Sequence, residues 1–513
     1  MKILIFSVIS SYKYGNTGID YIAKYLRKNE NDTITTKYYH HNEMAEFIKD
    51  DMPKDYDIYA FSVFETNYKL FKELAGFIKY NNENAIVIFG GQFVTINYLY
   101  MLEELKVVDY FILGDGERPF ERIINHHRYI HNKLEGDINI ATANDYLGKQ
   151  SNVERDVNRE TSFDYFEYDA EENNKEKTHC MLTKSNICAG ACSFCCSKKG
   201  IATYKNSSRI VDEISYLANS YGVKKFFLCD DDIFDVDCDE NRERLHTLFD
   251  RIENLQLNLA FSGFAKAKSI CNHKNRKLLE KMSRIGFHHL FIGIDAGNEI
   301  DRKLYNKKST LDEGKEAIKI LNSIGISPRY GMIFINPYTT LETMRENFRF
   351  LIEIHSTNYY HYGGLKVQLL SGTQLFERVK RDDLLNEKYS FLNTQEYLFK
   401  NPEIYPIVEF VQKEVIPKAD SVKNQFNTLK RKYDLVRHIN KEAENYKYII
   451  EEYEEKEFQN IKNFFFCLYE QNNLEYCRNN LGYFIQFMEK NSIVYKPIIE
   501  ELDNIFLSTP AKK

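Results

Sequence analysis

The chain has 513 residues, 43% of them hydrophobic and 28% charged, and a formal net charge of −6. This length and balance predict a globular protein of about two to four domains, and the mild acidity gives no reason to expect nucleic acid as a partner. No apolar run approaches the length of a membrane span, and the apolar start MKILIFSVIS lacks a basic leader and a cleavage site, so we expect a cytoplasmic protein without a membrane span.

Residues 1–125 alternate short apolar runs with helical patterns such as GIDYIAKYLRKN. The apolar runs are KILIFSVI, DIYAFSVF, AIVIFGG and VDYFILGDGE. This alternation predicts an open parallel α/β sheet, in which ligands bind at the carboxyl ends of the strands. Small residues that would let a ligand approach the backbone follow these runs, namely Ser62, Gly90, Gly91, Gly114 and Gly116. Plain turns are the alternative explanation for the glycines.

Residues 126–178 are polar and poor in strand pattern, which predicts a linker. Over residues 179–375 strands and amphipathic helices alternate again, and glycines after SY, RI and SI predict helix ends. The strand candidates are HCMLTKSNI, KKFFLCD, NLAFSGFAKA, HHLFIGIDA, RYGMIFIN and YGGLKVQLL. Six such strands make either an open doubly wound sheet or a partial βα barrel, and in both the chemistry belongs at the carboxyl ends of the strands.

Residues 376–513 have a helical pattern, with apolar residues at helical spacing inside a stretch of mixed charge. Two interpretations stay open for this region. It presents solvated helix faces, or it forms a cap that closes the bottom of the barrel or covers a substrate channel.

Four cysteines fall within the nine residues from Cys188 to Cys196, directly after the first strand of the second unit. In a reducing compartment such a cluster indicates a metal or redox site rather than disulfides. Cys188, Cys192 and Cys195 follow the spacing C-x3-C-x2-C, which lets one loop bring three thiolates to a 4Fe–4S cluster and leaves one iron open. A zinc site completed by Cys180 or Cys196, and chance clustering of buried cysteines, are the alternatives.

The loop NICAGACSFCC, with Phe194 before its last motif cysteine, resembles the signature of the radical S-adenosylmethionine (SAM) superfamily. Further segments, over approximately residues 1–375, are similar to the B12-binding class of that superfamily. They are GNTGIDYIAKYL, DIYAFSVFETN, IVIFGGQFVT, VDYFILGDGERPFERII, RIVDEISYLANSYGVKKFFLCDDDIF, LLEKMSRIGFHHLFIGIDAGN and SGTQLF. The resemblance implies a Rossmann-like sheet of the cobalamin-binding type, a partial (βα)6 TIM barrel and a helical carboxyl-terminal region.

The resemblance also implies roles for single residues. Cys188, Cys192 and Cys195 would hold the 4Fe–4S cluster, whose open iron binds SAM. Asp231 and Asp232 of DDDIF would contact the SAM ammonium group, which suits carboxylates; a solvated acidic turn or helix start is the alternative. Asp295 and Gly297 of GIDAGN would lie near the SAM ribose, although Asp and Ala replace the usual Glu and Ser and leave the ribose partner open.

Cobalamin would bind the amino-terminal sheet at the small residues named above. The chain lacks the Asp-x-His-x-x-Gly motif of a lower axial histidine, as this class generally does, and its first loop reads SSYKYGNTG instead of the usual Pro-rich version. A vestigial Rossmann-like domain, kept for packing or substrate docking, is the alternative.

The implied activity is reductive cleavage of SAM to a 5'-deoxyadenosyl radical, with cobalamin-dependent methylation of a carbon in a peptide or another small natural-product intermediate. The alternatives are an epimerase, cyclase or rearrangement enzyme without methyl transfer, and a non-catalytic cobalamin or SAM sensor. An electron donor such as flavodoxin or ferredoxin is implied as a partner. One cluster is expected, because residues 1–179 contain no cysteine and only Cys467 and Cys477 follow the barrel.

Overall fold

The computed structural model describes residues 1–9, 17–40, 54–129, 134, 137–142, 178–184, 187–197, 202–235, 238–422 and 425–510. The chain forms two compact units, an amino-terminal unit of Met1–Met181 with Asp212–Leu217 and a barrel unit of Leu182–Val211 with Ala218–Lys513. Most of the predicted linker, residues 126–178, lies outside the described residues, and the predicted domain limits at 125, 178 and 375 stay predictions. Among the described helices, none is long and apolar enough to cross a membrane.

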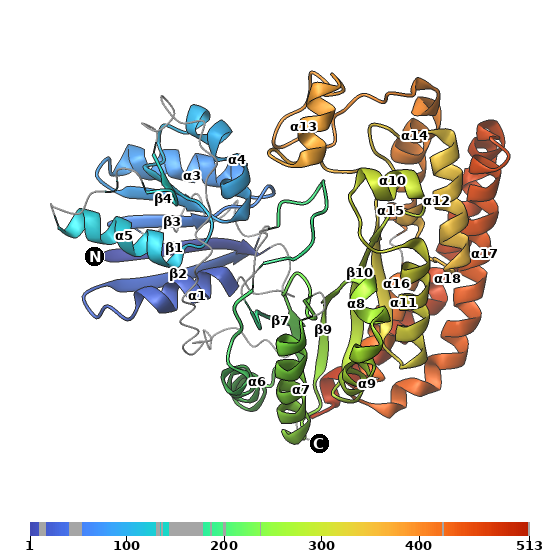
Figure 1. The fold of residues 1–513 in the computed structure, drawn as a ribbon, viewed down its shortest axis with the longest axis horizontal. Coiled ribbons are helices and arrows are strands. Elements are labelled where there is room, and N and C mark those ends of the chain that lie inside the picture. The colour runs from blue at the N-terminus through green and yellow to red at the C-terminus, as the bar shows by residue number, and fades with distance from the viewer. Residues whose placement is uncertain are drawn as a thin grey trace. The chain divides into compact units, whose positions relative to one another are not determined.

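Within its described part, the amino-terminal unit holds a six-stranded sheet in the order β2-β1-β3-β4-β5-β6 (Figure 1). The strands are β1 (Lys2–Ile9), β2 (Thr33–His40), β3 (Ile58–Ser62), β4 (Ile86–Gly90), β5 (Tyr110–Ile112) and β6 (Ile140–Ala141). All neighbours are parallel except β5 and β6. The order reverses between β1 and β3, and at such a switch point the carboxyl ends of the strands form a ligand crevice.

The two faces of this sheet carry different side chains. The helices that cover them are α1 (Thr17–Leu26), α3 (Tyr68–Asn81), α4 (Gln92–Glu104) and α5 (Glu117–Arg128). Isoleucines such as Ile3 and Ile88 face the buried residues of α1 and α5. On the other face, Phe61 stacks 5.0 Å from Phe6 and packs 4.9 Å from Phe71 of α3. Both faces are therefore buried, as the near-continuous apolar strands require.

The described part of the barrel sheet has five strands in the order β11-β10-β9-β8-β7. They are β7 (Thr178–Met181), β8 (Lys225–Leu228), β9 (Ala260–Ala265), β10 (Phe287–Asp295) and β11 (Ser327–Met332). The α/β fold with a Rossmann-like sheet, a partial barrel and a helical region is confirmed, but the sixth predicted strand is reduced to one parallel bridge, between Ile335 and Lys366. Gly363 has φ +117°, which no strand adopts, so pairing starts only after it.

The helices around the barrel sheet are α6 (Ser207–Tyr221), α7 (Asp239–Asn254), α8 (Ala267–Cys271), α9 (Arg276–Arg284), α10 (Glu299–Leu304), α11 (Leu311–Ser323) and α12 (Leu341–Glu353). Three of them end where the sequence predicts. Gly222, Gly286 and Gly325 follow α6, α9 and α11 with φ values of +68°, +103° and +79°. Glycine adopts this left-handed conformation without strain, which explains why the helices end there.

The helical region closes the amino-terminal ends of the barrel strands. Its main helices are α13 (Gln374–Arg381), α14 (Tyr405–Phe410), α15 (Ile416–Ser421), α16 (Gln425–Val436), α17 (Lys447–Tyr469) and α18 (Leu474–Ser508). Lys224, just before β8, donates to the Phe506 carbonyl at 2.6 Å, and Asn258, before β9, donates to Pro510 at 3.1 Å. His438 after α16 donates to the Gly325 carbonyl before β11 at 3.1 Å. These contacts support the interpretation as a cap at the bottom of the barrel.

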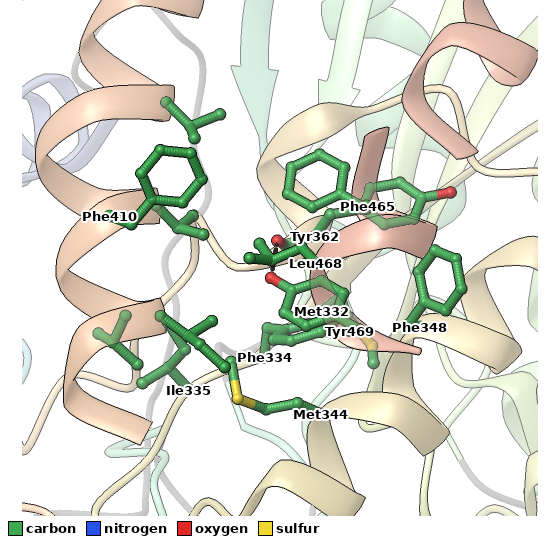
Figure 2. Close-up of a cluster of buried hydrophobic side chains, with 14 of the residues drawn as sticks. Met332, Phe334, Ile335, Met344, Phe348, Tyr362, Phe410, Phe465, Leu468 and Tyr469 are labelled. Carbon is green, nitrogen blue, oxygen red and sulfur yellow. Dashed lines mark hydrogen bonds between the residues drawn. The ribbon is translucent and has the colours of Figure 1, made fainter. Parts of the chain in front are cut away.

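A second contact joins the helical region to the end of β11. Figure 2 shows Met332 and Phe334 packed with Phe465 and Tyr469 of α17, all of them fully buried. The Tyr469 hydroxyl donates to the Tyr362 carbonyl at 2.6 Å, so this apolar cluster leaves no phenol unpaired. The barrel and its helical region therefore share one core.

The sharpest fold prediction concerns Gly286. An alanine Cβ there would lie 2.1 Å from the Leu259 carbonyl oxygen. We expect Gly286→Ala to destabilise the protein by more than the roughly 1 to 3 kcal/mol that a left-handed φ alone costs. The control is Gly325→Ala, whose Cβ would have its nearest neighbour, Ser283 Oγ, 4.0 Å away. Urea unfolding followed by circular dichroism measures both variants, and equal losses would contradict the close approach at Gly286.

Candidate active site

The cysteine loop follows β7, and Cys188, Cys192 and Cys195 are all half-buried. Backbone N–H groups point at two of the sulfurs. Gly190 N lies 3.2 Å from Cys188 Sγ, and Ser197 N lies 3.4 Å from Cys195 Sγ. Donors of this kind stabilise thiolates and help to set the potential of a cluster bound to them.

The loop is fixed to the segment that follows α10. Ser193 donates from its backbone N to the Tyr305 carbonyl at 3.0 Å, and Asn306 donates from its side chain to the Ala191 carbonyl at 2.7 Å. Phe194, the aromatic residue of the motif, meets the Tyr305 ring edge-on at 5.4 Å. The loop has no regular secondary structure, so these contacts determine where its thiols stand.

The donor set fits an iron–sulfur cluster. Three thiolates come from one loop, and each cysteine of a cubane binds a different iron, whereas the ligands of zinc converge on one ion at about 2.3 Å. In the described ranges, no three His, Cys, Asp or Glu side chains converge on a single metal ion. Cys196 is also half-buried but lies outside the C-x3-C-x2-C spacing.

The structure separates the three neighbouring aspartates that follow β8. Asp230 is fully buried and accepts hydrogen bonds from Thr183 N at 2.9 Å and Thr183 Oγ1 at 2.5 Å, so it ties β8 to the start of the cysteine loop. Asp231 is half-buried, and burial raises the pKa of its carboxyl, against the effect of the nearby Ser197 hydroxyl. Asp232 is fully buried, and burial raises its pKa too, against the attraction of Lys266.

Lys266, at the end of β9, is a site residue that the sequence analysis missed. Its Nζ lies 3.4 Å from Asp232 Oδ2, too poorly aligned for a hydrogen bond, and both atoms are buried without any other hydrogen-bond partner. A Cβ added to Gly190 would lie 3.1 Å from Cys188 Sγ and 3.5 Å from Lys266 Cε. A buried cation, Lys266, and a buried anion, Asp232, therefore lie beside Cys188 with unused hydrogen-bonding capacity. Their opposite charges are complementary to the carboxylate and the ammonium group of an amino acid.

Asp295 and Lys307 form a second ion pair near the loop. Asp295 follows a bulge in β10, has φ +62°, and accepts from Lys307 Nζ at 2.5 Å. Burial alone would lower the pKa of Lys307, but Asp295 and the nearby Cys192 raise it, so the lysine stays cationic. Gly297 is buried, and a Cβ there would lie 2.7 Å from Phe350 Cβ, so packing already explains this glycine.

In the amino-terminal unit, four of the five predicted small residues lie at strand ends or in the loops that follow them. Ser62 ends β3, Gly90 ends β4, and Gly91 and Gly114 begin the next loops with φ +107° and +84°. Thr95 joins the two loops, because its Oγ1 donates to the Gly91 carbonyl and accepts from Gly114 N, both at 2.9 Å.

The fifth small residue faces elsewhere. Gly116 caps α5, and a Cβ there would lie 2.6 Å from Ile22 Cδ1 of α1, so this glycine serves helix packing. Phe64, two residues beyond β3, is 46% exposed at the same edge as Ser62. Left-handed glycines and an exposed ring make an edge that fits a bulky, flat ligand. The loop of residues 10–16 after β1 lies outside the described residues.

Two family models match the chain. The radical SAM superfamily matches residues 182–351, and the B12 binding domain matches residues 8–124. Among curated proteins, the anaerobic magnesium-protoporphyrin IX monomethyl ester cyclase of Cereibacter sphaeroides is 23% identical over 61% of this chain and 52% of its own length. An uncharacterized methyltransferase of Pyrococcus horikoshii is 23% identical over 52% of this chain and 58% of its own length. The chain thus spans a little over half the length of these relatives.

Among solved structures, the chain resembles the cobalamin-dependent S-adenosylmethionine radical enzyme OxsB. The form with aqua-cobalamin bound gives a TM-score of 0.71 at 13% identity, over 99% of this chain and 84% of OxsB. The form with aqua-cobalamin and SAM bound gives a TM-score of 0.68 at 14% identity, over 98% of this chain and 80% of OxsB. The two family models match successive parts of one chain, so the chain contains a B12-binding domain and a radical SAM domain, and its cofactors are a 4Fe–4S cluster, SAM and cobalamin.

Proposed function

We propose that the protein is a cobalamin-dependent radical SAM methyltransferase that methylates an unactivated carbon of a peptide or natural-product intermediate. When bound, the cluster and SAM supply a 5'-deoxyadenosyl radical, and cobalamin supplies methyl transfer. The observation that carries the proposal is the buried Asp232–Lys266 pair beside Cys188, because its two unsatisfied groups match the ammonium and carboxylate of SAM. A non-catalytic cobalamin or SAM sensor could use this pair to bind SAM, but it would not need a cluster loop beside it.

Each residue has a proposed role in this scheme. Cys188, Cys192 and Cys195 ligate the cluster. Asp232, with Asp231 beside it, accepts from the SAM ammonium group, and Lys266 donates to its carboxylate. Asp295 would accept a hydrogen bond from a ribose hydroxyl group of SAM.

The proposed cobalamin edge uses Ser62, Gly90, Gly91 and Gly114, with Gly116 supporting α5 behind it. The reductant that such enzymes need would be a small electron carrier such as flavodoxin or ferredoxin.

Ring closure without methyl transfer is the second candidate. The Cereibacter sphaeroides relative, which is named a cyclase, favours ring closure. The Pyrococcus horikoshii relative, which is named a methyltransferase, favours methylation. Both reactions begin with the same radical, so the residues at the SAM site serve either one.

The cluster assignment predicts a sharp difference among neighbouring cysteines. Replacing Cys188, Cys192 and Cys195 together with alanine should abolish the brown iron–sulfur absorption and SAM cleavage after anaerobic reconstitution, with the fold kept. Cys196→Ala is the control and should keep both, because Cys196 lies outside the motif. The assignment would be contradicted by stoichiometric zinc without iron in the anaerobic wild type, or by loss of iron in the Cys196→Ala variant.

The Asp232–Lys266 pair predicts weaker SAM binding without loss of iron. Asp232→Asn should cost about 1.5 to 3 kcal/mol of SAM affinity, because a neutral amide cannot complete a charge-assisted hydrogen bond. That is a factor of roughly 10 to 150 in Kd, measured by anaerobic equilibrium dialysis. Asp239→Asn, at a carboxylate whose side chain is 69% exposed, is the control. Unchanged affinity in both Asp231→Asn and Asp232→Asn would refute the proposed contact of these carboxylates with the SAM ammonium group.

The cobalamin edge is best tested at Gly90. A Cβ at Gly90 would have only Ile112 within 4 Å, its Cβ at 3.6 Å and its carbonyl oxygen at 4.0 Å, so a side chain can begin there without a clash. Gly90→Leu should therefore keep the fold and lose bound cobalamin by steric overlap, with SAM cleavage to deoxyadenosine retained. Gly76→Leu in α3, where a Cβ meets nothing within 4 Å, is the control and should keep cobalamin. Ultraviolet–visible spectra of protein from cobalamin-replete cells report the corrin, and its absence from the wild type would refute the assignment.

A further inference from the structure

Lys307 lies beside the cysteine loop. Asn306, the residue before it, donates from its side chain to the carbonyl of Ala191 at 2.7 Å. Ala191 in turn precedes Cys192, so Lys307 and Cys192 each follow one member of a hydrogen-bonded pair. The side chain of Lys307 is 10% exposed, and a buried charge acts over a longer distance than a charge that water and salt screen. Lys307 is therefore placed to act on a group that the cysteines bind.

The side chain of Lys307 is paired with Asp295. Its Nζ donates to Asp295 Oδ2 at 2.5 Å, and the aspartate side chain is 15% exposed. Asp295 follows a register shift in β10 and has φ +62°, a left-handed conformation that is uncommon for residues other than glycine. A conformation that costs stability at a strand end indicates that this carboxylate serves the site as well as the packing.

Two glycines make room for this ion pair. Gly293 of β10 and Gly331 of β11 are cross-strand partners. A Cβ on Gly293 would lie 3.2 Å from Lys307 Nζ and 3.4 Å from Asp295 Oδ2. One on Gly331 would lie 3.4 Å from Asp295 Oδ1. Larger residues at these two positions would crowd the charged groups, so the sheet itself is built around the pair.

The two charges act unequally on Cys192. Burial raises the pKa of the Cys192 thiol; of the charged groups around it, Lys307 acts most strongly and lowers that pKa, whereas Asp295 acts less strongly and raises it. Burial opposes the charge of Lys307, but Asp295 and two of the motif cysteines raise its pKa. The cation therefore outweighs the carboxylate at the sulfur, and the field of the pair there is positive.

We propose that the Lys307–Asp295 pair adjusts the reduction potential of the 4Fe–4S cluster, with Lys307 raising it and Asp295 lowering it. Reduction brings one electron from a small electron carrier and needs no proton, so one negative charge is added at the cysteine loop. A nearby buried cation stabilises that charge, because net charge is one of the factors that determine cluster potentials. Lys307 thus acts through the cluster, without contact with SAM or the substrate. The inference rests on the proposed function, because it takes the three cysteines as the cluster ligands.

Single variants test the sign of each charge. Redox titration of the anaerobically reconstituted protein without SAM, followed by electron paramagnetic resonance of the reduced cluster, measures the potential. We expect Lys307→Met to lower the ratio of reduced to oxidised cluster about tenfold at a fixed potential, a shift of about 59 mV to more negative values for one electron. Asp295→Asn should shift the potential in the positive direction. Shifts of the same sign in both variants, or no shift in either, would overturn the proposal.

The double variant Lys307→Met/Asp295→Asn removes both charges. Because the cation outweighs the carboxylate at the sulfur, its potential should lie below the wild-type value and above that of Lys307→Met alone. General loosening of the site would not give this order, since it predicts the largest change where both groups are replaced. A double variant shifted further than Lys307→Met would therefore overturn the proposal.

Lys303→Met is the matched control. Lys303 is an exposed lysine of α10, four residues before Lys307, and solvent screens its charge, so its replacement should leave the potential unchanged. A shift equal to that of Lys307→Met would show that any lysine near the loop has this effect, and would overturn the specific role of Lys307.

Iron content and SAM cleavage are measured on the same preparations. A wild type that holds no cluster, or that cleaves no SAM, refutes the proposed function itself, whereas an intact wild-type cluster with unshifted variants refutes only this inference. If Lys307→Met loses its iron, Asp295→Asn decides: a positive shift supports the proposal, and an unchanged potential overturns it.

Discussion

The hydrogen bonds between the cysteine loop and residues 304–306 are the interaction on which the rest of the site depends. The loop cannot position its own thiols, and it takes its shape from Tyr305 and Asn306. Tyr305 is held in turn by Asn336, which donates to its hydroxyl at 2.9 Å and to Asp301 Oδ1 at 2.8 Å. All of these support residues except Asn306 are fully buried or nearly so. A buried carboxylate such as that of Asp301 is stable only when its oxygens accept hydrogen bonds. We therefore expect this satisfied network to hold Tyr305 in one position, and Tyr305 in turn to fix the cysteine loop.

The same stretch of chain connects the loop to its charged neighbours. Asp295 and Lys307 lie at the two ends of the segment that contains α10, and their ion pair closes it near Cys192. On the other side of the loop, Asp232 and Lys266 form the matching pair near Cys188. Charges in a half-buried site are tolerated when they are paired. Two lysines next to thiolates also favour an electron-rich centre, because net charge and hydrogen bonds to sulfur set cluster potentials.

Much of this could be read from the sequence, because it depends on local patterns. Spacing identified the cysteine loop, and glycines after helical patterns marked the ends of α6, α9 and α11. The edge strand β2, TITTKYYH, was missed because threonines and tyrosines replace the apolar run that marks a buried strand. Lys266 and Lys307 were missed because their partners, Asp232 and Asp295, are distant in the sequence and lie in other elements or loops. Asp230 bonds to Thr183, whereas Asp232 faces Lys266, and this difference depends on side-chain direction, which no motif specifies.

The central claim is that radical generation at the cysteine loop is used for methyl transfer. Mass analysis of the products formed from SAM by the anaerobically purified, cobalamin-supplied protein tests it most directly. The account predicts S-adenosylhomocysteine together with 5'-deoxyadenosine. Deoxyadenosine alone would contradict methyl transfer and favour ring closure or rearrangement, and the absence of both products would contradict radical SAM chemistry in this protein.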